Sequence, residues 1–186
     1  MKDIATTYQL YVNDLLAYAF YLGFDKEVAM DAIHDVFLKL SVDIVILSKT
    51  NNIKFYLFRA LKNKLFDIHK TKKMDIELLT PDINDKIPFE MHVTIDNDLI
   101  DVEDQLQIVA QLNEMLDSLT DRQREIIHLR YIQELDYEQI ASLMDISVHG
   151  CRKLVSQALL NLRKRYGGAM VLLLLRDAYM EALVCA

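Results

Sequence analysis

LTDRQREIIHLRYIQELDYEQIASLMDISVHGCRKLVSQALLNLRKRY, residues 119–166, is the stretch that decides the fold. Its segments Thr120 to Gln123 and Asp136 to Gln139 both have the form of a capping box, which satisfies free N–H groups at the start of a helix. Apolar residues follow each box, so the pattern predicts two helices. A turn over Asp145 to Ser147 then leads into a third, long helix from Val148 to about Arg165.

Two helices joined by a tight turn form a helix-turn-helix, the geometry that places a recognition helix in the major groove of DNA. In the long helix we expect the packing side to hold Leu154, Val155, Ala158, Leu159 and Leu162. The candidate DNA-binding residues on the outward side are Ser147, His149, Arg152, Lys153 and Ser156. A helix-turn-helix also occurs in proteins that bind no DNA, but cations at these positions favour DNA binding.

A helix expected over Lys54 to Lys70 has two faces when each residue is advanced by about 100°. Its core side comprises Leu57, Phe58, Leu61, Leu65 and Ile68. The opposite side holds the candidate nucleic-acid-binding residues Arg59, Lys62, Asn63, Phe66 and Lys70, with Asp67 at the margin. Cations neutralise phosphates, and an exposed aromatic ring stacks on an unpaired base. The alternative is a solvated basic face with one exposed Phe, and spacing alone does not separate the two.

Two further helices are expected near the N-terminus. The first runs from about Tyr8 until Gly23 supplies a stop, with apolar residues Leu10, Val12, Leu15, Leu16, Ala19 and Phe20. Asp25 caps the second, whose buried stripe is Ala29, Ala32, Ile33, Val36, Phe37 and Leu40. Another face of that helix carries Asp31, His34, Asp35 and Leu38. Like charges one turn apart cost an isolated helix a few tenths of a kcal/mol, so this face is either solvated or meets a basic partner.

Charge is unevenly distributed along a chain whose formal net charge is -7. Residues 51–73 hold seven Lys and Arg against one acid, whereas residues 74–117 hold twelve acids, one base and both prolines. The acidic stretch predicts a solvated linker. Beyond residue 166, the apolar residues predict a C-terminal helix that needs cover, and burial against the protein's own domains is favoured over contact with another chain. That segment is too short and too charged to span a bilayer, so no membrane insertion is expected.

Composition narrows the fold and the chemistry further. Of 186 residues 52% are hydrophobic, and only 4 Gly and 2 Pro are present, so we predict an all-α protein and exclude a sandwich or barrel. Cys151 and Cys185, without a CxxC motif or a His/Cys cluster, are expected to be small buried hydrophobes in a reducing cytoplasm. No signal peptide, phosphate-binding glycine loop or metal-ligand spacing is visible. We therefore expect no enzyme activity, no metal and no cofactor.

Three segments, in order, resemble the extracytoplasmic-function (ECF) sigma factors of bacterial RNA polymerase. Residues 119–166 are similar to region four of that family. DKEVAMDAIHDVFLKL, residues 25–40, resembles the region-two helix that docks on the polymerase clamp. FYLFRALKNKLFDIHK, residues 55–70, resembles the helix that melts the promoter and reads the minus-ten element.

The resemblance implies a non-catalytic promoter-specificity subunit whose partners are core RNA polymerase, promoter DNA and, where one exists, an anti-sigma factor. It assigns polymerase docking to Asp31, His34, Asp35 and Leu38. It assigns minus-ten reading and melting to Arg59, Lys62, Asn63, Phe66, Asp67 and Lys70. It assigns minus-thirty-five reading to Ser147, His149, Arg152, Lys153 and Ser156. Sigma linkers thread through polymerase, which also gives the acidic stretch a role.

The chain departs from the family pattern at several positions. His34 stands where the family usually has Gln, which makes the docking face titratable. Asp145 replaces the usual turn Gly, and Asp tolerates a positive φ better than most residues. Gly150 and Cys151 replace a common Thr-Val pair, and Gly there costs helix stability of about 1 kcal/mol. The segment after Tyr166 has no counterpart in the simple pattern.

The expected organisation is a region-two-like domain over 1–73, an acidic linker over 74–111, a region-four-like domain over 112–166 and an apolar helical extension over 167–186. One alternative is a helix-turn-helix regulator that acts without core polymerase, its N-terminal block serving oligomerisation. Another is a degenerate sigma-like adaptor that binds protein and no DNA. Loss of the base-contacting cations would favour the adaptor, and those cations are present.

Overall fold

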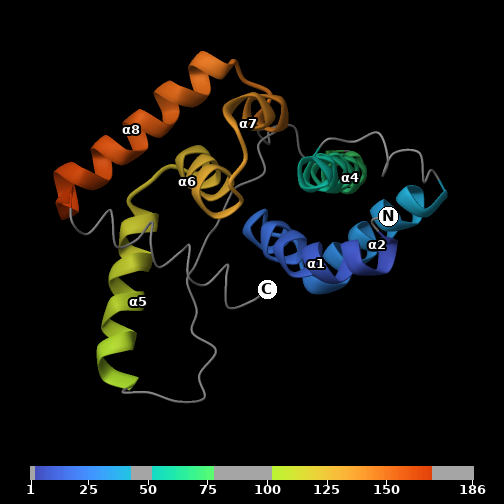
Figure 1. Ribbon diagram of the computed structural model, residues 1–186, viewed down its shortest axis with the longest axis horizontal. Helices are drawn as coiled ribbons and strands as arrows, with labels where there is room; N and C mark the ends of the chain where they lie inside the picture. Colours follow the sequence, from blue (N-terminus) through green and yellow to red (C-terminus); the bar gives the residue numbers. More distant parts are fainter. Residues whose placement is uncertain (1–2, 43–51, 78–101, 169–186) are drawn as a thin grey trace. The chain divides into compact units, whose positions relative to one another are not determined.

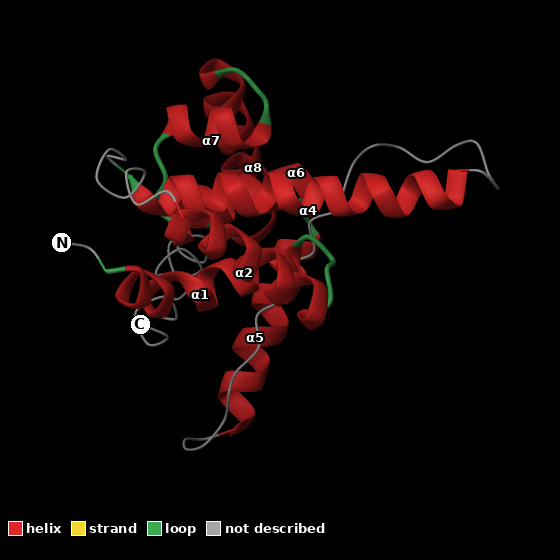
Figure 2. Cartoon of the chain, turned by 90° about the vertical axis from the view of Figure 1, so that its right-hand side faces the viewer, coloured by secondary structure: helices red, strands yellow, loops and turns green. Residues whose placement is uncertain are grey.

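The computed structural model describes residues 3–42, 52–77 and 102–168, and within these ranges it contains helices and turns and no strand (Figures 1 and 2). This confirms the prediction of an all-α fold. The helices are α1 (Ile4–Tyr21), α2 (Lys26–Val42), α4 (Ile53–Glu77), α5 (Val102–Asp117), α6 (Asp121–Ile127), the π-helix η1 (His128–Ile132), α7 (Tyr137–Met144) and α8 (Val148–Tyr166). The chain divides into two compact units, Met1–Pro88 and Phe89–Ala186.

In the first unit, α1, α2 and α4 pack against one another. The rings of Tyr18 on α1 and Phe58 on α4 meet with their centroids 5.1 Å apart, and both side chains are fully buried. The other fully buried side chains of this core include Leu15, Ala19, Ala29, Ala32, Ile33, Leu40, Leu57, Leu61 and Leu65. Burying such side chains contributes about 1.5–3 kcal/mol for each large one, which is what holds three helices of modest length together.

Helix α1 was predicted correctly as a helix but not in its inward face. It begins at Ile4, earlier than the expected start at Tyr8, and it ends before Gly23, whose φ of +78° confirms the predicted stop. Leu10 is 58% exposed and Phe20 is 41% exposed, although both belong to the apolar repeat. Thr7 and Tyr18 are buried instead. Apolar spacing alone therefore did not identify the side of α1 that packs on its neighbours.

The starts of α2 and α4 follow from side-chain caps. The Asp25 carboxylate accepts a hydrogen bond from the Val28 N–H at 2.9 Å, as predicted, and the Asn52 side chain accepts one from the Phe55 N–H at 3.0 Å. All six residues of the predicted α2 stripe are buried. Helix α4 runs to Glu77, beyond its expected end at Lys70.

Helices occupy both ends of the stretch predicted as a linker, 74–111. Helix α4 extends into it from one side, and α5 begins inside it at Val102. The high density of acids hid this helix, because charge counting does not detect the apolar residues Leu112, Met115 and Leu116 that α5 buries. The remainder of the predicted linker and the apolar extension from 169 onward lie outside the described residues.

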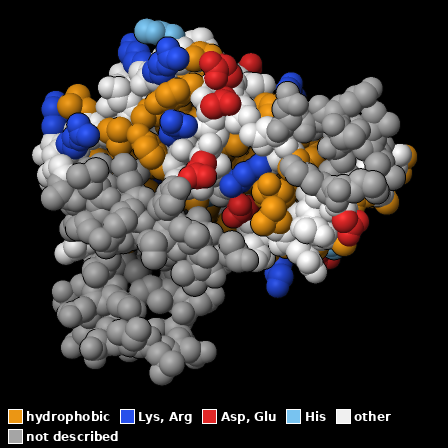
Figure 3. All heavy atoms as spheres, viewed as in Figure 1, with side chains coloured by type: hydrophobic (Ala, Val, Ile, Leu, Met, Phe, Trp, Pro, Cys, Tyr) orange, Lys and Arg blue, Asp and Glu red, His pale blue; other side chains and the backbone are white. Residues whose placement is uncertain are grey.

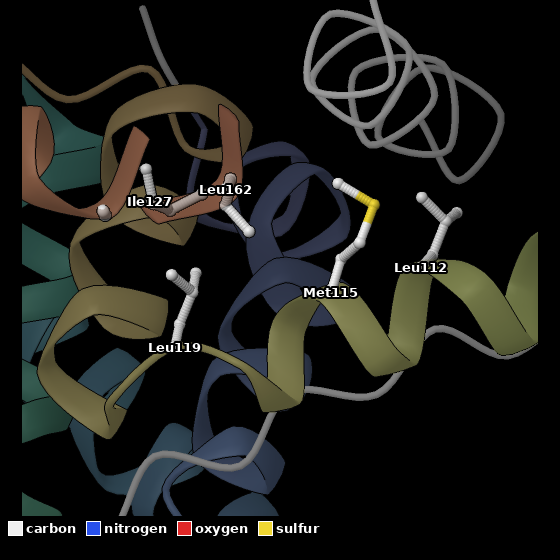
Figure 4. Packing of buried hydrophobic residues seen from close by; sticks show 6 residues of the cluster. Leu112, Met115, Leu119, Ile127 and Leu162 are labelled. Atoms are coloured by element: carbon white, nitrogen blue, oxygen red, sulfur yellow. The ribbon is translucent and has the colours of Figure 1, made fainter. Parts of the chain in front are cut away.

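In the second unit, α5, α6 and α8 share a core. Figure 4 shows its members converging from the three helices. They are Leu112, Met115, Leu119, Ile127, Ala158 and Leu162, with Tyr131, Leu159 and Tyr166 packed at the edge. The Tyr166 hydroxyl donates to the Glu114 carbonyl at 3.3 Å, which ties the end of α8 to α5. Cys151 lies on the buried side of α8, as expected for a small core residue, and burial raises the pKa of its thiol. Cys185 lies outside the described residues.

The structure confirms both predicted capping boxes. At the start of α6 the Thr120 hydroxyl accepts from the Gln123 N–H at 3.4 Å, and the Gln123 side chain accepts from the Thr120 N–H at 3.2 Å. At the start of α7 the equivalent distances between Asp136 and Gln139 are 2.8 and 3.1 Å. Each cap is worth about 1 kcal/mol, so the two boxes fix where the short helices α6 and α7 begin.

The turn between α7 and α8 is fixed from both sides. Asp145 ends α7 with φ of +53°, the left-handed conformation expected at this position. The Ser147 hydroxyl caps α8 by accepting from the Gly150 N–H at 3.0 Å. A Cβ on Gly150 would lie 3.2 Å from the Ser147 hydroxyl oxygen, so the glycine leaves room for this cap. Arg122 donates to the Met144 carbonyl at 3.2 Å and satisfies the end of α7.

Candidate nucleic-acid interface

Helix α8 presents the predicted outward residues on one exposed face. Ser147, His149, Arg152, Lys153 and Ser156 are all exposed. On the opposite side Cys151, Val155, Ala158 and Leu162 are buried, while Leu154 and Leu159 are half-buried at the margin. The structure thus separates the packing side from the outward side as the sequence predicts, with Leu154 and Leu159 less buried than expected.

All charged side chains of α8 are positive. Its residues include Arg152, Lys153, Arg163, Lys164 and Arg165 and no acid. All five cations are exposed, and none forms an ion pair with a described residue. In Figure 3 Lys and Arg side chains gather on the surface over α8, with a His beside them. An uncompensated row of cations along one helix is the electrostatic footprint of a phosphate-binding surface.

Arg152 has a contact that sequence analysis missed. Its guanidinium carbon lies 5.5 Å from the ring centroid of Tyr137, the first residue of α7. The guanidinium of Arg130 lies 5.0 Å from the same centroid, and Arg130 also donates to the Leu135 carbonyl at 2.9 Å. The sequence held one indication of this contact: an aromatic residue, Tyr137, directly follows the Asp136 cap, at the end of α7 that adjoins η1.

The outward side of α4 exposes fewer of the candidate nucleic-acid-binding residues than expected. Arg59, Asn63, Asp67 and Lys70 are exposed, and Phe66 is half-buried among them. Lys62 was predicted on this outward face, but it is only 9% exposed, and its ammonium lies 5.7 Å from the Phe66 ring centroid. Lysine can occupy such a position because its four-carbon stem packs like an apolar chain.

The core side of α4 also differs from the prediction at Ile68. This residue is half-buried, whereas the other expected core residues, Leu57, Phe58, Leu61 and Leu65, are fully buried. The buried side of α4 therefore includes Lys62 and excludes part of Ile68, so it is rotated slightly from the predicted core side. As a result, the outward row carries two exposed cations, Arg59 and Lys70, with an amide and an aromatic ring between them.

The α2 face combines acids with exposed apolar residues. Asp31 and His34 are exposed, Leu38 is 64% exposed, and Val42 continues the row at 82%. The Tyr8 hydroxyl and His34 Nε2 lie 3.2 Å apart, and their rings stack with centroids 6.1 Å apart. An exposed Leu and Val one turn apart beside acids form a surface suited to a protein partner more than to DNA.

Asp35 is less available than its neighbour Asp31. Its carboxylate pairs with the Lys64 ammonium on α4 at 2.6 Å, and this hydrogen bond and charge hold the pKa of Asp35 below its ordinary value. Asp31 forms no ion pair with a described residue. The expected repulsion between the two acids is thus relieved by Lys64, and of the two acids Asp31 is the one that pairs with no described residue.

The chain is similar to known proteins over most of its length. Residues 110–162 match the family model described as Sigma-70, region 4. The ECF RNA polymerase sigma factor SigM of Bacillus subtilis (strain 168) is 25% identical over 169 residues, covering 86% of this chain and 92% of SigM. The sigma factor RpoE of Bartonella quintana, solved in complex with the anti-sigma factor NepR, superposes with a TM-score of 0.60 at 20% identity, covering 88% of this chain and 96% of RpoE.

Three observations together define a promoter-recognition subunit of bacterial RNA polymerase. They are the helix-turn-helix with its cationic face, the basic helix α4 in the other unit, and the match to sigma region 4. Such a subunit directs transcription initiation. The relatives agree with this class: the chain contains a sigma-70 region 4 and is similar over most of its length to extracytoplasmic-function sigma factors. In the part of the chain that the structure describes, no helix is both long and apolar enough to cross a membrane.

Proposed function

We propose that this sigma factor docks on core RNA polymerase through the α2 face, reads and melts the minus-ten region through α4, and reads the minus-thirty-five element through α8. The domain roles follow: 1–73 serves docking and melting, 112–166 serves upstream recognition, and the chain between them is a connector. The single observation behind the proposal is the α8 face, where Arg152 and Lys153 are exposed near the capped start of the helix and pair with no described acid.

The three surfaces differ in the chemistry that each partner requires. Recognition of duplex DNA needs cations for phosphates and donors for base edges, which α8 supplies. Melted DNA needs an aromatic ring and an amide more than a dense charge, which α4 supplies with Phe66 and Asn63. A protein partner needs apolar contact and complementary charge, which α2 supplies with Leu38 and Asp31.

The proposal extends to partners and location. The chain acts without a catalytic centre of its own, without a cofactor, and in the cytoplasm with the polymerase. RpoE is named as binding an anti-sigma factor, and we propose a partner of that class here as well. The site for it is left to experiment.

Run-off transcription with core polymerase from the source bacterium tests the proposal. We expect specific transcripts only when core enzyme and this chain are both present. A chain that protects the promoter alone and gives no transcript with core enzyme would instead be a regulator that acts without polymerase. A chain that binds core enzyme but gives neither promoter protection nor transcripts would be an adaptor.

Charge reversal on α2 tests the docking face separately. Asp31→Lys should reduce co-purification with core polymerase, because it replaces the exposed acid of the face that pairs with no described residue by a cation. Glu138→Lys, at an exposed acid on α7, is the matched control and should leave retention unchanged. Equal retention of both variants and of the wild type would assign the α2 face to solvent.

A further inference from the structure

The ring of Tyr137 contacts the one arginine on the outward face near the start of α8. We propose that Tyr137 is a positioning residue, which holds the Arg152 guanidinium in the orientation that reads a base edge in the minus-thirty-five element. The inference rests on the proposed function of α8. Its geometric basis is the distance of 5.5 Å between the Arg152 guanidinium carbon and the Tyr137 ring centroid, within the range of a cation–π contact.

Tyr137 belongs to a fixed part of the domain. It is the first residue of α7, directly after Asp136, whose capping box with Gln139 sets the start of that helix. Its side chain is half-buried. The Arg130 guanidinium lies 5.0 Å from the same ring, and its hydrogen bond to the Leu135 carbonyl holds it in place. The ring is thus held by η1 and by the loop before α7, independently of α8.

Arg152 needs such support because it is exposed on a long, flexible side chain. In the part of the chain that the structure describes, it forms no ion pair. An acid would restrain the guanidinium too, but it would occupy the N–H donors that must reach the base. An aromatic ring restrains the planar group through its face and leaves the N–H edge free for a bidentate contact with guanine O6 and N7.

A ring that lies under a guanidinium can act through its shape or through its charge distribution, and only the second is the role proposed. The negative face of the ring comes from its quadrupole, which fluorine substitution weakens while size and burial are largely kept. We therefore replace Tyr137 with Phe, difluoro-Phe and trifluoro-Phe in the full chain and assemble holoenzyme with core polymerase. The readout is position-resolved base preference in a library randomised across the minus-thirty-five element.

We expect Tyr137→Phe to keep the wild-type preference. Each step of fluorination should lower the discrimination at the base read by Arg152, reaching about two- to fivefold for the full series, the range of an exposed cation–π contact. Binding to a non-specific duplex should not change across the series. Equal base discrimination in all three variants would overturn the positioning role, because a ring that acts only by packing does not respond to its quadrupole.

A double-mutant cycle separates failure of this inference from failure of the proposed function. Arg152→Ala should reduce discrimination at its base about tenfold or more. Tyr137→Leu should reduce it two- to fivefold when Arg152 is present and have no further effect in the Arg152→Ala background. If Arg152→Ala leaves base preference unchanged, the assigned role of α8 is wrong, and the role of Tyr137 falls with it. If Arg152→Ala has its effect but Tyr137→Leu lowers discrimination equally in both backgrounds, only the positioning role is wrong.

Discussion

Helices α4 and α8 are both basic in sequence, yet the structure uses their cations differently. On α8 all five cations are exposed, and none is paired with an acid among the described residues. On α4 Lys62 is buried, Lys64 pairs with Asp35 on α2 at 2.6 Å, and Lys54 pairs with Asp14 on α1 at 3.4 Å. Some cations of α4 are therefore buried or paired with acids of the same unit and are not exposed to a partner.

The difference teaches that a basic helix and a basic surface are separate properties. Because α4 lies against two helices that carry acids, its cations on the flanks find intramolecular partners. Among the α4 side chains that the structure describes, Arg59 and Lys70 are the cations exposed on the outward row, with Asn63 and Phe66 between them. Helix α8 packs with one side on an apolar core and exposes its other side, where its cations lie. We infer that α8 contributes more to duplex affinity and α4 more to selection of unpaired bases.

The largest effect that this comparison predicts is at α8. Replacing Arg152 and Lys153 together with Ala should weaken binding to the minus-thirty-five element by roughly 2–4 kcal/mol, because both base and phosphate contacts are lost. The slope of log affinity against log salt should also fall by about 1–2. Footprinting of the holoenzyme over a salt series measures both. Lys164→Ala, at an exposed cation near the other end of α8, is the control for general charge loss.

At α4 the expected effect is on strand opening. Phe66→Ala should impair open-complex formation by about 1–3 kcal/mol, the value of one base–aromatic stack, while binding to core polymerase is unchanged. Asn63→Ala should impair opening in the same direction, because an amide that can bond a base edge is lost. Permanganate reactivity of unpaired thymines on the promoter reports the opening. If both variants open the promoter as well as the wild type does, the outward row of α4 is a solvated surface and the contrast with α8 disappears.

The sequence predicted the helix-turn-helix in nearly full detail because its determinants are local. Two capping boxes, the left-handed Asp145 and the Ser147 cap each involve residues within a few positions of one another. The face of α8 followed from these, because a helix with fixed ends and a clear apolar stripe has one orientation on its core. The exposed set from Ser147 to Ser156 was thereby predicted without knowledge of the partner helices.

The features that sequence reasoning missed depend on distant residues. Lys62 is buried although the helical repeat places it on the outward row, and Leu10 is exposed because no described element covers that side of α1. The contact of Tyr137 with Arg130 and Arg152 joins three elements. The start of α5 at Val102 was missed for another reason. This segment contains both acids and apolar residues at helical spacing, and the linker prediction rested on its net charge alone.

Two substitutions on α4 test the comparison through a smaller expected change, in the salt dependence of promoter binding. Arg59→Met should lower the salt dependence of promoter binding by close to one phosphate contact, a change in slope of about 0.7–0.9. Lys62→Met keeps the length of the buried stem and should leave that slope unchanged, because the buried ammonium does not release counterions on DNA binding. A titration of holoenzyme with promoter DNA at several salt concentrations compares the two. Equal slopes for Arg59→Met and Lys62→Met would return Lys62 to the DNA-binding surface.

The smallest effect concerns the charge that α4 shares with α2. Lys64 lowers the pKa of Asp35 from its ordinary value of 3.8, so the folded state favours the ionised carboxylate and binds fewer protons than the unfolded state. The resulting stabilisation is present above the unfolded pKa and is lost as the pH falls through the lower folded pKa. Asp35→Asn should therefore unfold at slightly lower urea than the wild type near pH 7, and the difference should close below pH 3.8. Asp31→Asn, at an acid that pairs with no described residue, is the control for the loss of one surface acid and should unfold at the same urea concentration as the wild type near pH 7. A gap for Asp35→Asn that stays constant down to pH 3 would mean that Lys64 does not hold this carboxylate, and that α4 keeps one more cation for DNA than the structure assigns to it.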